Sequence, residues 1–204
     1  MKTKITVLAV TLCLTTLFQC AEKKSEDASA KEEFPEQASA AYGGFESQIK
    51  WGQHLVIIAG CNDCHTPKKM SDHGPVLDSA LLLSGHPAQF PPMDINRKEL
   101  ETKVVVSNML LTEWAGPWGV SYTANLTPDD TGIGSWTEEQ FFKAIREGKL
   151  KGLDGSRPLL PPMPWEMIRH MTDGELSAVF AFLKSIKPVS NIVPAPLPPA
   201  NAGS

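Results

Sequence analysis

The chain has 204 residues, which suits one domain of ordinary size with short appendages. Its formal net charge of −4 argues against a nucleic-acid-binding protein, and its 42% hydrophobic content is compatible with a packed core. The 17 prolines indicate many loops. The four cysteines are Cys13, Cys20, Cys61 and Cys64, so only one pair lies beyond the N-terminal segment.

The N-terminus has the pattern of an export signal. Lys2 and Lys4 precede an apolar run over residues 5–18, which is short for a membrane span. The run ends in Leu-Phe-Gln-Cys, which resembles a bacterial lipoprotein signal. We expect residues 1–19 to be a signal peptide and Cys20 to carry a lipid anchor on the periplasmic side of a bacterial membrane. A signal peptide cut nearby, or an uncleaved anchor, is the alternative.

Residues 20–44 form the next segment and are rich in Ala, Glu, Lys and Ser. Such a composition buries too little apolar surface to offset the entropy of ordering, so we expect a flexible tether. From residue 45 to residue 60, apolar and small side chains recur at helical spacing, and Gly60 ends the pattern. Gly52 lies in the middle of this predicted helix and costs it about 1 kcal/mol, which indicates a second helix crossing closely there.

The segment Cys61-Asn62-Asp63-Cys64-His65 follows this helix directly. Two thiols separated by two residues and followed at once by histidine form the attachment signature of a c-type haem. The thiols bond to the porphyrin vinyl groups, and the adjacent imidazole reaches the iron as an axial ligand. The alternatives are a redox dithiol, which does not need the histidine, and a zinc site, which needs two more ligands at similar spacing.

A long segment over residues 66–134 shows little helical periodicity and contains several Gly-Pro and Pro-Pro turn signals. Residues 104–106 and 120–122 are β-branched or aromatic enough to form a short hairpin. After it, Thr137 with Gln140 opens a helix that runs to Gly148.

A capping box of Thr172 and Glu175 opens the last helix, over residues 172–187, and Pro188 ends it. Its apolar positions recur at helical spacing, and Phe180 or Phe182 is placed to cover Gly52. Residues 191–204 form a proline-rich tail that we expect to be extended.

Taken together, the glycine-containing helix, the CNDCH motif, the late PPMPW segment and the final helix ending in AFLKSI resemble a class I cytochrome c. The blocks TPDDTGIGSWTEEQFFKAIREG, PPMPW and MTDGELSAVFAFLKSI are similar to one haem domain of the cytochrome c subunits of membrane-bound alcohol and gluconate dehydrogenases. The resemblance covers residues 45–190. It implies a mainly α, cytochrome c-like domain with long loops around one covalent haem c.

The resemblance also nominates residues around the iron. Met163, whose flanking prolines stiffen its loop and which precedes the last helix, is expected to be the second axial ligand opposite His65. A methionine that only fills a core gap is the alternative. Other methionines and histidines are weaker candidates: Met93, Met109, Met167, Met171, His73, His86 and His170.

By the same resemblance, the Pro75 carbonyl is expected to accept the ring N–H of His65. Trp136 and Trp165 are expected to wall the haem, because burying a flat apolar porphyrin needs aromatic and aliphatic surface. Candidate partners for the haem propionates are Trp118, Tyr122, Asn125, Arg146 and Arg157.

The function that these patterns predict is single-electron transfer between periplasmic or membrane redox partners, such as a dehydrogenase or an oxidase. No catalytic triad, phosphate loop or nucleotide fingerprint occurs in the sequence, which favours an electron carrier over a catalyst. The alternative is a haem enzyme, or a gas or peroxide sensor, with an open axial position.

Overall fold

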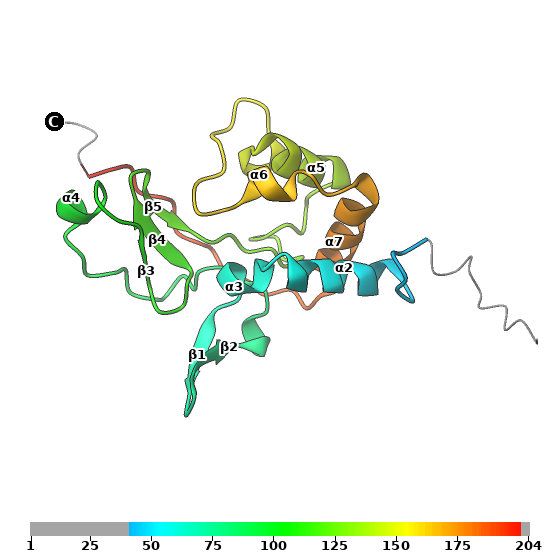
Figure 1. Ribbon diagram of the computed structural model, residues 1–204, viewed down its shortest axis with the longest axis horizontal. Coiled ribbons are helices and arrows are strands. Elements are labelled where there is room, and N and C mark those ends of the chain that lie inside the picture. The colour runs from blue at the N-terminus through cyan, green and yellow to red at the C-terminus, as the bar shows by residue number, and fades with distance from the viewer. Residues whose placement is uncertain (1–40, 201–204) are drawn as a thin grey trace, which may run out of the picture. The chain divides into compact units, whose positions relative to one another are not determined.

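The computed structural model describes residues 41–200 (Figure 1). The predicted signal peptide at 1–19, the lipidation site at Cys20 and nearly all of the tether at 20–44 lie outside the described residues. Between residues 41 and 200, no helix is long and apolar enough to cross a membrane.

Three helices carry most of the apolar core, and they confirm the three that the sequence predicts. They are α2 (Gln48–Ile58), α5 (Glu138–Glu147) and α7 (Asp173–Ser185). Both predicted capping boxes are present: the Thr137 hydroxyl accepts from the Gln140 amide, and the Thr172 hydroxyl accepts from the Glu175 amide. In each box the fourth residue's side chain also bonds to the amide of the threonine, so the first turn of each helix leaves fewer amides unpaired.

The helices α2 and α7 cross at Gly52 (Figure 1). A β-carbon at Gly52 would lie 1.8 Å from the carbonyl oxygen of Ala178 and 2.9 Å from the β-carbon of Phe182. The predicted close crossing is therefore confirmed, because only glycine leaves room for the second backbone. Phe182 is the phenylalanine that covers the glycine, whereas Phe180 packs on Phe141 with ring centroids 5.3 Å apart.

The CNDCH motif forms a short helix of its own, α3 (Cys61–His65), after a turn at Gly60 with a φ of 69°. A two-stranded antiparallel hairpin follows, made of β1 (Lys68–Ser71) and β2 (Gly74–Leu77). Figure 1 shows it extending away from α3, and the short turn η1 (Ser79–Leu81) follows β2. This hairpin was not predicted.

A second antiparallel sheet forms later in the segment without helical periodicity, after the short helix α4 (Arg97–Leu100). Its strands are β3 (Val106–Ser107), β4 (Glu113–Gly116) and β5 (Gly119–Tyr122), in that spatial order. The predicted hairpin of residues 104–106 with 120–122 was wrong in its pairing, because β4 lies between the two strands. The tight turn joining β4 to β5 closes at Gly119, whose φ of 96° suits a glycine.

The remaining elements complete the domain. The turn η2 (Leu150–Gly152) follows α5, and the short helix α6 (Trp165–Ile168) follows the proline-flanked Met163. Residues 186–200, which we name the C-terminal strap, cross from the end of α7 to the second sheet, where Leu197 pairs with Val120 of β5 (Figure 1). The helices supply most of the apolar core, to which Leu83 and Ile133 also contribute, and with two small sheets present the prediction of a mainly α domain is confirmed only in part.

Candidate functional site

The two thiols of α3 are free, and both are half-buried. Burial raises the pKa of Cys61 to about 11 and also raises the pKa of Cys64. A redox-active dithiol needs a thiol with a lowered pKa, because the thiolate is the reactive form. The raised pKa values of Cys61 and Cys64 do not favour a redox dithiol.

The zinc alternative finds no support in the described part of the chain. A structural zinc ion needs four Cys, His or acidic ligands that converge on one point. Among residues 41–200, no group of three or more such side chains is placed to hold a metal ion.

The His65 ring is buried and its orientation is set by one hydrogen bond. Its Nδ1 lies 2.8 Å from the carbonyl oxygen of Ala124. Because a carbonyl oxygen only accepts, Nδ1 carries the proton and Nε2 keeps a free lone pair. Burial lowers the pKa of His65, which favours the neutral ring. The prediction that Pro75 supplies this carbonyl was wrong, because Pro75 lies in β2, in the hairpin that extends away from α3.

The Ala124 carbonyl, which accepts the hydrogen bond from His65, was not predicted from the sequence. It lies against Gly85, where a β-carbon would come within 2.6 Å of the Ala124 carbonyl carbon and oxygen. The Gly85 amide also donates to the carbonyl oxygen of His65, at 2.8 Å. The only sequence signal was the glycine itself, whose Gly-His-Pro context indicates no more than a turn. Next to Ala124, the hydroxyl of Thr123 is buried without a hydrogen-bond partner in the described part of the chain.

These residues fit a covalently attached haem. Two unpaired thiols stand on α3, and the adjacent imidazole is neutral with its Nε2 lone pair free. The donor set is that of haem c, with thioether-forming thiols and a nitrogen ligand.

Met163 lies in the loop between η2 and α6, half-buried at the edge of the apolar core. Cys61 and Trp136 pack against the same core. The Met163 loop is tied to the second sheet by the Ser121 hydroxyl, which donates to the Pro161 carbonyl at 2.6 Å. Met163 and the haem motif thus border one apolar cluster, although they are about a hundred residues apart in the sequence.

The other methionines and histidines considered as iron ligands differ from Met163 in their exposure or in their partners. Met109 and Met167 are 68% and 75% exposed, and His73 and His170 are also exposed. His86 is only 1% exposed, but its Nδ1 is 3.0 Å from the Thr112 hydroxyl and its ring packs against Tyr122. His86 therefore differs from His73 and His170, because it is buried and has partners within the protein.

Several residues nominated for the haem propionates have partners within the protein. The indole of Trp118 donates to Ser121, and Asn125 is buried with its amide bonded to Val189 and Thr131. Arg146 forms an ion pair with Asp173 at 2.7 Å.

The remaining residues proposed to lie near the haem are Arg157, Tyr122 and Trp165. Arg157 donates to the carbonyl of the next residue, Pro158, and burial lowers its pKa. Burial raises the pKa of Tyr122, which keeps the phenol neutral. Trp165, nominated to wall the haem, packs over Gly148 at the end of α5, and the Arg169 guanidinium lies 5.5 Å from its ring centroid.

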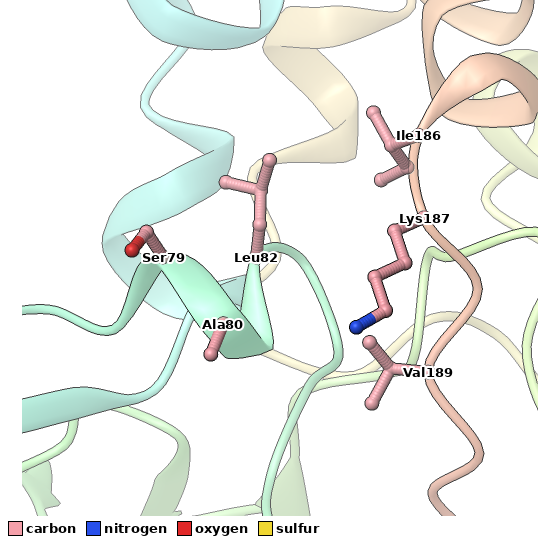
Figure 2. Close-up of a pocket in the computed structure, with 6 residues that line it drawn as sticks. All are labelled: Ser79, Ala80, Leu82, Ile186, Lys187 and Val189. Atoms are coloured by element: carbon pink, nitrogen blue, oxygen red, sulfur yellow. The ribbon is translucent and has the colours of Figure 1, made fainter.

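Figure 2 shows a pocket in which side chains of η1 and of the strap face each other. Its volume is about 110 Å³, and its lining consists of Ser79, Ala80, Leu82, Ile186, Lys187 and Val189. A pocket for a drug-sized or larger ligand measures roughly 300–1,000 Å³. Because it is small and has neither a thiol nor an imidazole in its lining, this pocket is not the haem site.

Curated proteins with detectable similarity include cytochrome subunits of several dehydrogenases. The chain is 30% identical over 155 residues, 75% of its length, to "Alcohol dehydrogenase (quinone), cytochrome c subunit" of Gluconobacter oxydans. It is 29% identical over 143 residues, 69% of its length, to "Fructose dehydrogenase cytochrome subunit" of Gluconobacter japonicus. It is 37% identical over 78 residues, 37% of its length, to "Gluconate 2-dehydrogenase cytochrome c subunit" of Pantoea cypripedii.

The matched regions cover 24%, 22% and 17% of these three relatives, so the chain corresponds to a fraction of each. No family profile matches the chain. The resemblance to cytochrome c subunits of dehydrogenases is confirmed by these relatives, and they support electron transfer by a cytochrome.

Proposed function

We propose that this chain, a homologue of the cytochrome c subunits of alcohol and fructose dehydrogenases, carries one covalent haem c and transfers single electrons between redox proteins. The observation that carries the proposal is the His65–Ala124 hydrogen bond in a CNDCH motif, because it leaves Nε2 free to bind iron. When bound, haem supplies a one-electron couple at its iron.

The residues of α3 hold the group in this proposal. Cys61 and Cys64 form the two thioether bonds, and the five-residue helix fixes the spacing between them. His65 supplies the first axial ligand, and its ring cannot turn freely because Nδ1 is bonded to Ala124. The apolar side chains around Cys61 and Trp136 exclude water from one side of the site.

Met163 supplies the second axial ligand in this proposal. Its place at the edge of the same core as Cys61 supports this assignment. The flanking prolines limit the freedom of its loop, so little entropy is lost when the thioether binds. A thioether ligand raises the reduction potential of the iron relative to a second nitrogen ligand.

The proposed partners are redox proteins, with a dehydrogenase as donor or an oxidase as acceptor. The relatives' names support a dehydrogenase. We also propose export to the periplasmic side of a bacterial membrane and a lipid anchor on Cys20, on the strength of the N-terminal sequence alone.

A denaturing gel stained for haem peroxidase activity tests the proposal. The full chain, expressed with a cytochrome c maturation system, should stain, and its haem-to-protein ratio should be one. The Cys61→Ala/Cys64→Ala double variant should not stain, whereas Met109→Leu, a change at an exposed methionine, should leave the stain unchanged. A parent chain without covalent haem would overturn the proposal.

The same holoprotein separates an electron carrier from a haem enzyme or sensor. A carrier with both axial positions filled gives a low-spin ferric spectrum. Its ferric form takes up cyanide slowly, and its ferrous form takes up carbon monoxide slowly. A high-spin spectrum with rapid uptake of these ligands would show an open position and would favour the enzyme or sensor.

A further inference from the structure

The carbonyl that orients His65 belongs to a segment that is held from several sides. The Thr123 amide donates to the Thr112 carbonyl at 3.0 Å, and the Thr123 carbonyl accepts from the His86 amide at 2.9 Å. Ala124 itself lies on Gly85, with no room for a β-carbon between them. The position of the Ala124 carbonyl therefore depends on where residues 84–86 lie.

Residues 84–86 are in turn fixed by one side chain of the C-terminal strap. The amide nitrogen of Asn191 donates to the carbonyls of Ser84 and His86, at 2.7 and 2.9 Å, and so brackets Gly85. The amide oxygen of Asn191 accepts from the backbone amide of Ala88 at 3.0 Å. All three bonds join residues more than a hundred positions apart.

The strap also holds the other side of Ala124, through Asn125. This side chain is 4% exposed and donates to the Val189 carbonyl at 2.9 Å and to the Thr131 hydroxyl at 3.0 Å. Its oxygen accepts from the amide and the hydroxyl of Thr127. The Asn125 amide thus uses both its donors and both its acceptor positions, so it has one satisfied orientation.

From these contacts we propose that Asn191 and Asn125 are positioning residues for His65. Through them the C-terminal strap sets the strength of the bond between His65 Nδ1 and the Ala124 carbonyl. This inference rests on the proposed function, because the reporter is the haem iron bound by Nε2. A stronger Nδ1–H bond makes the imidazole a better electron donor and favours ferric iron, so loosening the strap raises the reduction potential.

The test compares full-length holoprotein variants at conditions where each is folded. Asn191→Ala removes all three side-chain bonds and should shift the midpoint potential upward. The amides of Gly85 and His86 should exchange with solvent faster, because their acceptors on His65 and Thr123 become less fixed. Should Asn191→Ala fail to fold, Asn191→Leu keeps a side chain of similar size, removes the same three bonds without adding a charge, and should give the same upward shift.

Two control variants separate positioning from general destabilisation. Ile192→Ala changes the neighbouring strap residue, whose side chain is 76% exposed, and Asn96→Ala removes an exposed asparagine next to α4. Both should leave the midpoint potential and the exchange of the Gly85 amide at the parent values.

The outcomes distinguish the positioning role from the proposed function. An Asn191 variant that loses stability but keeps the parent midpoint potential would overturn the positioning role and leave the proposed function intact. A parent chain that carries no covalent haem would overturn the proposed function and this inference with it.

Discussion

The region formed by α2, α5 and α7 buries apolar side chains, whereas residues 83–127 and the strap bury many polar ones. In the first, the helical region, the buried side chains are Leu55, Val56, Phe141, Ala144, Ile145, Leu176, Ala178, Val179, Phe182 and Leu183. In the second, the polar region, they include Ser84, His86, Glu101, Asn108, Thr112, Glu113, Ser121 and Asn125.

The stability of the helical region depends on apolar packing, whereas that of the polar region depends on hydrogen bonds. Burying a Leu or Phe side chain stabilises the folded state by roughly 1.5–3 kcal/mol. Substituting it by another apolar side chain of similar volume costs little of this stability. A buried hydrogen bond contributes about 1 kcal/mol net, but leaving its partner unpaired costs about 1–3 kcal/mol. The helical region should therefore be sensitive to volume, and the polar region to the loss of a single donor or acceptor.

The largest effect is expected in the helical region at Gly52. Gly52→Ala places a carbon 1.8 Å from the Ala178 carbonyl oxygen, so α2 and α7 must separate. We expect a loss of about 3 kcal/mol in the free energy of unfolding, measured by urea denaturation of the holoprotein.

Gly174→Ala is the matched control for this substitution. It is also a helical glycine, in α7, but its β-carbon would meet the Trp51 ring at an ordinary 3.4 Å. We expect unchanged stability or a gain of up to about 1 kcal/mol, because alanine favours the helix. Equal behaviour of the two variants would show that the crossing is not tight.

In the polar region, Asn125→Asp keeps the shape of the side chain and removes both donors. The Val189 carbonyl keeps only the Thr127 hydroxyl as a side-chain donor, the Thr131 hydroxyl loses the donor from Asn125, and a carboxylate is buried beside a carbonyl. We expect a loss of about 2 kcal/mol at pH 7 by urea denaturation, with partial recovery at pH 4, where the protonated acid regains one donor. The exposed change Asn96→Asp removes only a 3.4 Å bond to the Glu99 carboxylate, so it should cost little, and an equal loss there would contradict the distinction between the regions.

A smaller effect is expected at the edge of the helical region. Thr172→Ala removes the hydroxyl that accepts from the Glu175 amide at the start of α7. The expected loss is about 1 kcal/mol, as for other N-cap substitutions. Thr102→Ala, at an exposed threonine, is the control; a matching loss there would assign the effect to composition rather than to the cap.

The smallest effect is a pH dependence in the polar region. Burial lowers the pKa of His86, so the folded state favours the neutral ring. The stabilisation is complete above the unfolded pKa of about 6.5 and is lost as the pH falls through the lowered folded pKa. Between pH 7.5 and pH 5, the parent should lose more stability than His86→Gln, as followed by urea midpoints. Parallel losses in both proteins would mean that His86 is not the titrating group.

The helical region could be predicted closely from the sequence because its signals are local. Helical spacing of apolar residues and two capping boxes gave α5 and α7 to within a residue or two of their ends. Gly52, a poor helix former inside a strong helical pattern, revealed the crossing. The thiols and His65 were also evident, since five consecutive residues carry the whole motif.

The polar region could not be predicted in the same way. The partner of His65 is a backbone carbonyl, which leaves no trace in the sequence, and it lies 59 positions away. Asn191 forms a hydrogen bond with a residue more than a hundred positions earlier, and no periodic pattern in the sequence predicts this contact. The strand β4 was missed because Glu113 and Trp114 begin it, and the buried glutamate does not look like a strand residue. Its carboxylate accepts from the Met93 amide, which makes that burial possible.

The two regions meet at the proposed haem site, where α3 contributes His65 and the polar region contributes the Ala124 carbonyl. Met163 completes the site only if its sulfur binds the iron. Ferric holoprotein should show the weak near-infrared methionine-to-iron charge-transfer band, and Met163→Ala should abolish it, whereas Met167→Leu, at a side chain that is 75% exposed, should keep it. A band that survives in Met163→Ala, or that is absent from the parent, would contradict the assignment of Met163 as the second ligand.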